Sequence, residues 1–380
     1  MSIFSCALLH GLNHAFQLLL PPLYLSIRNN FRLTGLSPVM LFSTIYFVVY
    51  AAMSLPYGFL GDRFSKKKVL IFGAALNSIA FLVAATTQSY TAFMAAMVLA
   101  GLGGGAYHPV ANALISNLFK GALGRAFGLI GMGASFGLFA GPVLSGFIGE
   151  QFGWRMSCLA FAVFGCIVAA FSVLIIPEEP AVQSRKEESN ITLTALVAPL
   201  LPVILVLGLR DFCLWGTVYL TPAMTQMNMD FSKKLAGTLI GIMSLTGVIS
   251  QPLAGMMSDR FGRRRVVFIA LIISCLMVSI FPYLNRIYIF AVAVVSGFML
   301  LGTVPVMDAV CAEIIPPSLR GRLFGVMMTL GLMIGALSPY CMGLIHDIFS
   351  GYRMAYLILG FSGLAGAVIV FTVPSRRAYS

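Results

Sequence analysis

The chain contains 380 residues, of which 59% are hydrophobic and 9% are charged, whereas soluble domains average about 25% charged residues. Because a chain this apolar has too few polar residues to cover a water-exposed surface, the composition excludes a soluble globular protein and indicates a membrane protein. The net charge of +12 does not indicate nucleic-acid binding, because Lys and Arg cluster in short loops and form no basic face. Seven Cys and four His without paired spacing predict neither disulfides nor a metal site, and no cofactor is expected.

Apolar runs long enough to form membrane-spanning helices recur along the whole chain. A helix needs about 20 mainly apolar residues to cross the hydrocarbon core. The first half contains six such runs, at 3–27, 37–60, 69–88, 92–117, 126–148 and 155–176. The second half contains six more, at 195–220, 236–257, 266–284, 287–312, 322–345 and 353–373. The first run lacks a basic n-region and a small-residue cleavage site, so we predict a membrane helix rather than a signal peptide.

Three landmarks of the first half return in the second half at nearly constant spacing. Two pairs are 197 residues apart and the third is 198 apart: GFLGDRFSKKK around Asp62 and GMMSDRFGRRR around Asp259, GRAFGLIG at Gly124 and GRLFGVMM at Gly321, and FGWR ending at Arg155 and SGYR ending at Arg353. The repeat predicts an all-α polytopic membrane protein with two pseudo-symmetric six-helix bundles, residues 1–176 and 195–380, joined by a linker at 177–194. Such duplicated halves are typical of alternating-access carriers.

The distribution of positive charge predicts the orientation in the membrane. Loops on the same side as the linker carry sixteen Lys and Arg residues, whereas loops on the opposite side carry seven. Because cytoplasmic loops are enriched in Lys and Arg, we expect the linker and both termini to be cytoplasmic, in a multi-pass protein of the cell membrane.

The repeated loop motif resembles the G-x-x-x-D-R-x-G-R-R signature of the major facilitator superfamily. The matching residues are Gly58, Asp62, Arg63, Ser65, Lys66 and Lys67 in the first half, and Gly255, Asp259, Arg260, Gly262, Arg263 and Arg264 in the second. The resemblance implies the major facilitator fold with 12 transmembrane helices, and a gate on the cytoplasmic side. In that gate the glycines would allow close helix approach and the aspartates would pair with Arg. Ser65 stands where the signature has Gly.

A second motif extends the expected gate. The segment EIIPPSLRG resembles the second-half latch partner of the same superfamily and adds Glu313 and Arg320, while Ser116 occupies the equivalent place in the first half. Asp308, near the cytoplasmic end of the tenth span, is expected to join Glu313 or Arg320 in this gate.

The fifth span carries a pattern of small residues that resembles the G-x-x-x-G-P-x-x-G-G motif of drug–proton antiporters. Its residues are Gly137, Gly141, Pro142, Ser145 and Gly146. Small residues allow tight helix packing and Pro142 provides a flex point, so the motif favours export, with generic packing as the alternative. Val98 stands where such antiporters usually carry Arg. The GGGAYHP segment and the His-rich first span are similar to the fosmidomycin-resistance branch.

Polar residues at membrane depth identify the candidate site. His10, Asn13, His14 and Gln17 follow helical spacing and form one stripe that should face the cavity. Adding 197 to Asn13 and His14 gives Arg210 and Asp211 in the seventh span, two neighbours that need not pair with each other. We expect Asp211 to carry the proton with His14 or His10 as its partner, because histidine titrates near neutral pH. Arg210 would hold an anionic substrate or neutralise Asp211; the alternative is a structural ion pair.

Further residues are candidates for binding the substrate. Pro109 interrupts the helical hydrogen bonds beside His108, which is expected to expose that side chain. The candidate substrate contacts are Arg210, Asn13, Gln17, Tyr107, His108, Trp215 and Tyr219.

Together these features predict a secondary active transporter for a small organic solute. Proton-coupled efflux is the first hypothesis, proton-coupled uptake of an organic anion is the alternative, and a membrane sensor or scaffold that retains the fold is the non-transport alternative. The sequence has no Walker A pattern and no nucleophile–base or H-E-x-x-H motif, so we do not expect an enzyme. The expected partners are the small-molecule substrate, protons and the lipid bilayer, without nucleic acid, and the protein is expected to act as a monomer.

Overall fold

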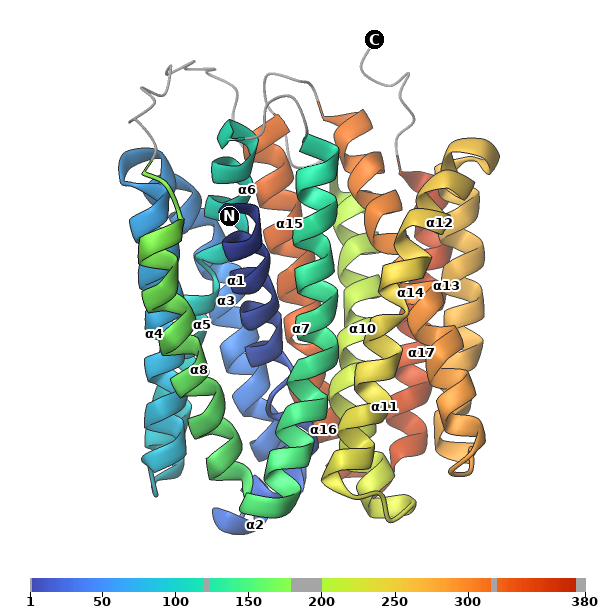
Figure 1. Cartoon of the computed structure of the whole chain (residues 1–380). Coiled ribbons are helices and arrows are strands. Elements are labelled where there is room, and N and C mark those ends of the chain that lie inside the picture. Colours follow the sequence, from blue (N-terminus) through green and yellow to red (C-terminus); the bar gives the residue numbers. More distant parts are fainter. Residues whose placement is uncertain (1, 119–122, 179–199, 316–319, 374–380) are drawn as a thin grey trace. The chain divides into compact units, whose positions relative to one another are not determined.

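The computed structural model describes residues 2–118, 123–178, 200–315 and 320–373, and all regular elements within these ranges are helices (Figure 1). Twelve spans are long and apolar enough to cross a membrane, which confirms the predicted number. They are Ile3–Asn30, Ser37–Arg63, Lys66–Thr86, Tyr90–Ser116, Ala126–Phe152, Trp154–Ile175, Leu201–Asn228, Lys233–Phe261, Arg263–Tyr283, Tyr288–Ile314, Gly325–Phe349 and Tyr352–Thr372.

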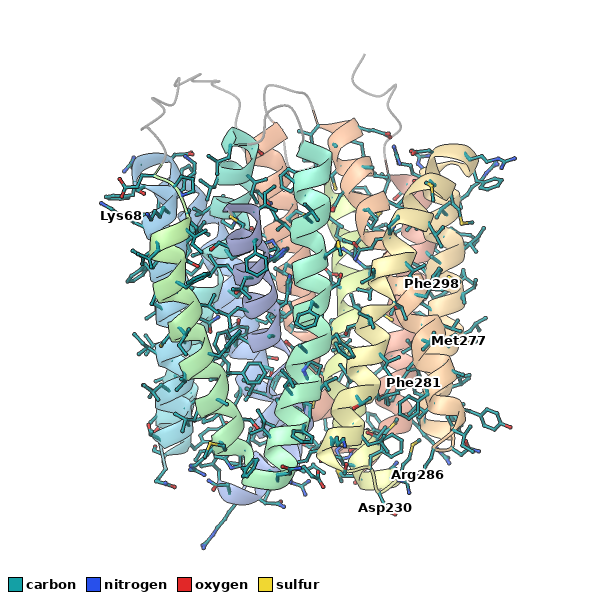
Figure 2. All side chains as sticks on the ribbon, viewed as in Figure 1. Lys68, Asp230, Met277, Phe281, Arg286 and Phe298 are labelled. Atoms are coloured by element: carbon teal, nitrogen blue, oxygen red, sulfur yellow. The ribbon has the colours of Figure 1, made fainter. Side chains whose placement is uncertain are left out.

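The first compact unit comprises Met1–Ser184 and Tyr219–Gly241. Its helices are α1 (Ser2–Gln17), η1 (Pro21–Leu23), α2 (Tyr24–Asn30), α3 (Ser37–Arg63), α4 (Lys66–Thr86), α5 (Tyr90–Gly104), α6 (Tyr107–Leu118), α7 (Leu123–Phe152), α8 (Trp154–Ile175) and the larger part of α11 (Lys233–Leu245). Figure 2 shows Lys68 and Asp230 at opposite ends of this unit.

The second compact unit comprises Arg185–Val218 and Ile242–Ser380. Its helices are the first part of α10 (Leu201–Asn228), α12 (Gly247–Phe261), α13 (Arg263–Ile280), η3 (Phe281–Tyr283), α14 (Tyr288–Ile314), α15 (Arg320–Ala336), α16 (Ser338–Phe349), α17 (Tyr352–Ile369) and η4 (Val370–Thr372). The sequence boundary at 177–194 lies mostly outside the described residues, and the end of α10 packs with the first unit. Division into halves at that linker therefore stays a prediction.

The internal repeat is visible in how the helices pack. In the first unit α7 lies against α1 so closely that a Cβ on Gly137 would collide with the backbone oxygen of Gly11. In the second unit α15 approaches α10 in the same way, and a Cβ on Gly335 would come within 2.6 Å of the Asp211 Cβ. The first span thus packs on the fifth, and the seventh on the eleventh, in line with the sequence repeat.

The third repeated landmark lies at the start of the sixth and of the twelfth span. Arg155, at the start of α8, donates hydrogen bonds to Asn30 Oδ1 at 2.7 Å and to the Thr87 carbonyl at 2.8 Å. Arg353, at the start of α17, lies over the ring of Tyr283, 5.2 Å from its centroid. Each Arg thus ties its helix to a neighbouring loop or helix end.

Large apolar side chains are exposed along the helices, among them Leu174, Ile287 and Phe361. An exposed apolar surface of this kind suits contact with lipid and would be costly in water. The exposed apolar side chains therefore suit a protein whose outer surface contacts lipid.

Candidate functional site

The glycine-rich fourth span positions the first polar cluster. Gly101 packs on the Tyr46 carbonyl of α3, and Gly103 lies against Gly73 and Asn77 of α4, so α5 fits tightly between these two helices. The span is then interrupted at residues 105–106, and α6 begins at Tyr107. The predicted disturbance of the helix near Pro109 is thus observed, and it places His108 in the first turn of a new helix.

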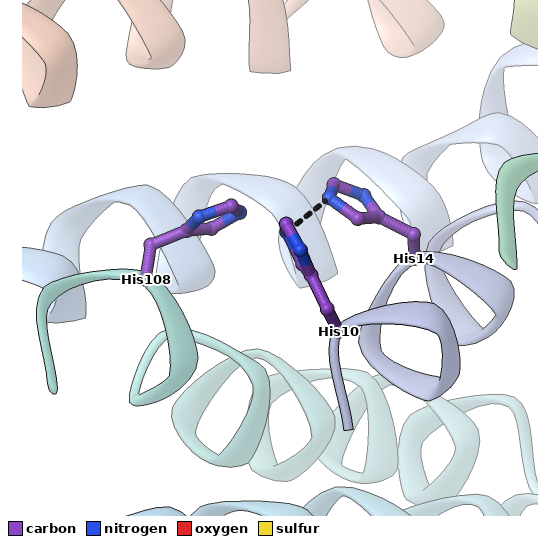
Figure 3. A group of neighbouring side chains, drawn as sticks. All are labelled: His10, His14 and His108. Atoms are coloured by element: carbon purple, nitrogen blue, oxygen red, sulfur yellow. Dashed lines mark hydrogen bonds between the residues drawn. The ribbon is translucent and has the colours of Figure 1, made fainter. Parts of the chain in front are cut away.

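Three histidines from two helices meet in the first unit (Figure 3). His10 and His14 on α1 lie with their Nε2 atoms 3.2 Å apart. The ring centroid of His108 on α6 is 5.0 Å from that of His10 and 5.4 Å from that of His14. The His10 ring also stacks on Tyr107, with centroids 4.6 Å apart. The sequence spacing of the histidines had predicted no metal site, yet the fold gathers three of the four.

The remaining polar residues of the α1 stripe are buried among partners in the same unit. Asn13 donates to Tyr50 Oη at 3.1 Å, and Gln17 Oε1 lies 2.7 Å from His14 Nδ1. Tyr219, near the end of α10, donates to the Gln17 carbonyl at 2.9 Å. Asn13 and Gln17 are 6% and 3% exposed, so the stripe forms part of a packed hydrogen-bonded interior.

Two expected substrate contacts are held by polar interactions or close packing. Tyr107 Oη donates to the Cys6 carbonyl at 2.7 Å, so its hydroxyl fixes α6 against α1. In the second unit, Trp215 lies on α10 beside Gly335, where a Cβ would be 3.3 Å from the Trp215 ring. Their contact with a substrate stays a prediction.

A charged cluster lies inside the second unit. Arg210 and Asp211 of α10 are only 2% and 8% exposed. The Arg210 Nε lies 3.1 Å from Asp211 Oδ1, although neither Nε nor Nη1 of this guanidinium has a partner with hydrogen-bond geometry. The two neighbours, which need not have paired, form an ion pair, and this agrees with the alternative in which Arg210 neutralises Asp211.

Asp308 belongs to this charged cluster. The charges of Arg210 and Asp211 act on its buried carboxylate, and its expected place in the cytoplasmic gate with Glu313 or Arg320 stays a prediction. Its Oδ1 is buried and has no hydrogen-bond partner in the described part of the chain. The sequence signal for this residue was a carboxylate inside an apolar span.

The second copy of the loop motif contains an ion-pair network. Arg263 Nε lies 2.8 Å from Glu313 Oε1, and Arg263 Nη1 lies 3.0 Å from Asp259 Oδ1. Arg263, a member of the motif, is therefore the residue that bridges the two acids. Arg260 instead lies over the Phe261 ring, and Arg264 donates to the Val373 carbonyl.

The first copy of the loop motif is organised differently. Asp62 and Arg63 are exposed, and among the described residues neither of them, nor Lys67, takes part in an ion pair. Ser116, at the place equivalent to Glu313, donates to the Asn112 carbonyl at 2.8 Å. The side chain of Arg320 lies outside the described residues. Whether these residues act as a gate stays a prediction.

The motif glycines do not mediate the close helix approach that we expected. A Cβ on Gly58 would meet only the Pro109 Cβ at 3.9 Å, an ordinary contact, and a Cβ on Gly255 would meet nothing within 4 Å. Close approach occurs instead in the fifth span. Gly137 and Gly141 pack on α1, Gly146 packs on the backbone of Lys233, and the Pro142 carbonyl lies against Gly237.

Twelve spanning helices in two related units, with charged groups buried at membrane depth, define a polytopic membrane transport protein. The sequence model of the Major Facilitator Superfamily matches residues 3–249 and 212–379. The chain therefore belongs to the major facilitator superfamily and is a multi-pass membrane transporter of this family.

Relatives and solved structures agree with this assignment. The chain is 24% identical over 385 residues to "Multidrug resistance protein MdtG" of Serratia proteamaculans, covering 96% of this chain and 91% of the relative. It is 27% identical over 283 residues to the protein of the same name from Klebsiella pneumoniae, covering 69% of this chain and 66% of the relative.

The fold is similar to that of a bacterial homolog of the human lysosomal transporter Spinster in its inward-facing and occupied conformation. The TM-score is 0.78 at 17% identity, covering 98% of this chain and 94% of the other. The inward-facing and unoccupied conformation of that homolog gives a TM-score of 0.74 at 16% identity.

Proposed function

We propose that this protein exports small organic compounds across the cell membrane by alternating access, in exchange for protons. The relatives named as multidrug resistance proteins support export of organic compounds. The termini and the linker would then be cytoplasmic, in line with the excess of Lys and Arg in the loops on that side.

The observation that carries proton coupling is the imbalance of charge in the buried cluster of the second unit. It contains two carboxylates, Asp211 and Asp308, against one guanidinium, Arg210. A net negative charge at membrane depth is expensive, and one bound proton removes it. The buried Asp308 Oδ1, which has no partner among the described groups, is a place for that proton. His10 and His14 belong to a separate cluster in the first unit, so we assign the proton to the carboxylates.

The same cluster argues against uptake of an organic anion. For an anion to bind at Arg210, its guanidinium charge would have to be available, yet two carboxylates already act on it. An added anion would raise the negative charge of the cluster further. A cationic or neutral organic compound is therefore the better supported substrate class.

The experiment uses everted membrane vesicles that contain the full-length protein and a pH-sensitive dye, with ethidium as the first probe. In the wild type, ethidium should enter the vesicles at the expense of the proton gradient. Asp211→Asn should abolish this gradient-driven accumulation, because the neutral amide cannot release a proton. Counterflow exchange of ethidium in reconstituted vesicles should remain measurable, because exchange requires no net proton movement.

Asp230→Asn is the matched control, because Asp230 is an exposed carboxylate with a φ of +50° that Asn readily adopts. This control should transport like the wild type. Full gradient-driven transport in Asp211→Asn and in Asp308→Asn would overturn the assignment of the proton to the carboxylates.

A further inference from the structure

In the histidine cluster of the first unit, the facing Nε2 atoms of His10 and His14 cannot both be satisfied by the neutral rings alone. His10 Nδ1 lies 3.0 Å from the Ile130 carbonyl, which can only accept, so this nitrogen carries the proton and His10 Nε2 presents a lone pair. His14 Nδ1 lies 2.7 Å from Gln17 Oε1, and with the Gln17 amide in this orientation the His14 proton is also on Nδ1. With these tautomers the two Nε2 atoms, 3.2 Å apart, direct two lone pairs toward each other, and either a proton or a metal ion between them would satisfy both.

From this arrangement we propose that His10, His14 and His108 bind a divalent transition-metal ion. The ligand atoms that these residues offer all lie within 4.8 Å of one another. In a tetrahedral site with Zn–N bonds of about 2.0–2.1 Å, two ligand nitrogens are about 3.3 Å apart, close to the 3.2 Å between His10 and His14. His108, which lies beside both partners in Figure 3, would be the third ligand.

The surroundings of the cluster are those of a ligating site. Histidines that bind a metal donate their second ring N–H to a carbonyl or another fixed acceptor, which holds the ring and its tautomer. Ile130 accepts from His10 in this way, and Gln17 accepts from His14. His108 takes part in none of the hydrogen bonds found in the described part of the chain, so both of its ring nitrogens are available. All three side chains retain intermediate exposure, which leaves a route for the ion.

The ligand set determines the kind of ion. Three imidazoles without a carboxylate suit Zn²⁺, Co²⁺, Ni²⁺ or Cu²⁺, whereas Mg²⁺ and Ca²⁺ require oxygen ligands. Three protein ligands leave a fourth position open, as in tri-histidine zinc sites, and a hydroxide or a donor atom of a bound solute would fill it. The histidines contribute no charge, so an anionic fourth ligand would also reduce the charge that the ion brings into the membrane.

The test is direct metal binding to the purified full-length protein, carrying an affinity tag without histidine. Accessible thiols such as the exposed Cys166 are blocked with N-ethylmaleimide, and bound metal is first removed with a chelator. Calorimetric titration with Zn²⁺ should give one equivalent bound, and Co²⁺ should give the visible absorption of a four-coordinate site. Because the ion binds the folded state, Zn²⁺ should also raise the temperature of thermal unfolding.

Variants assign the ion to the three residues. His10→Gln, His14→Gln and His108→Gln should each weaken Zn²⁺ binding by at least about tenfold, since even residues that only support metal ligands account for about 10–100-fold. His346→Gln is the matched control, because His346 lies in the second unit beside Asp347 at 3.1 Å, and it should bind Zn²⁺ like the wild type. Each variant is first shown to be monodisperse and to unfold cooperatively without metal.

Two results would overturn the proposal. One is the absence of Zn²⁺ and Co²⁺ binding by the wild type, which would mean that only a proton lies between His10 and His14. The other is binding that survives the combined replacement of all three histidines, which would locate the metal elsewhere. Neither result bears on the proton site at Asp211, since that site lies in the other unit.

Discussion

At the scale of single residues, the two copies of the loop motif differ in their backbone as well as in their sequence. Gly262 has a φ of +91° where α13 begins, a conformation that favours glycine. Ser65, at the equivalent place, has a φ of −57° and caps α4 by accepting a hydrogen bond from the Lys68 amide. Serine therefore replaces glycine in the first copy because that turn uses a side-chain cap instead of a left-handed residue.

This difference predicts opposite effects for two glycines of one motif. A Cβ on Gly255 or on Gly262 would meet nothing within 4 Å. Alanine at the two positions should therefore differ in effect only through the backbone conformation that it must adopt. Gly255→Ala, inside α12, should stabilise the protein by up to about 1 kcal/mol, because Ala is the better helix former. Gly262→Ala should destabilise it by about 1–2 kcal/mol, because it forces Ala to a positive φ. Thermal unfolding of both purified variants tests this, and equal shifts would contradict it.

At the scale of helices, the contact of α1 with α7 holds the histidine cluster in place. Gly137 and Gly141 lie directly on the backbone of Gly11 and Ala15, and Ile130 of the same helix accepts from His10. The antiporter-like motif therefore corresponds to a real helix interface, although its role in export stays a prediction.

Two Gly→Ala substitutions on α7 should distinguish the effect of helix packing on stability from the effect of helix propensity. Gly137→Ala should lower the free energy of unfolding by about 1–3 kcal/mol, because its Cβ would collide with the Gly11 backbone. Gly131→Ala, on the same helix but with no atom within 4 Å of its Cβ, should cause no loss. Thermal unfolding of the two variants measures the difference, and a Gly137→Ala protein as stable as the wild type would refute the tight interface.

At the scale of the whole molecule, the orientation in the membrane follows from charge and can be measured. Lys68 and Asp230 lie at opposite ends of the first unit (Figure 2) and are both exposed. In a Cys166→Ser background, a membrane-impermeant maleimide should label Asp230→Cys in right-side-out vesicles. It should label Lys68→Cys only after the vesicles are permeabilised. The reverse pattern would show that the loops rich in Lys and Arg are not cytoplasmic.

The sequence by itself determined the features that depend on local composition. Twelve apolar runs predicted twelve helices because the bilayer thickness fixes how many apolar residues a span needs. The repeat predicts that Asp211 holds the position in the second half that His14 holds in the first, because duplicated chains keep equivalent positions in equivalent helices.

Only the tertiary structure decided which distant residues meet. His108 joins His10 and His14 because α5 packs between α3 and α4 and ends just before Tyr107, and the buried Asp308 of α14 comes under the charge of Arg210 of α10. In a helix where nearly every residue is apolar, the sequence carries no periodic signal that separates the lipid-facing side from the buried side. The direction of each polar side chain is therefore fixed by helix packing, and with it the composition of both clusters.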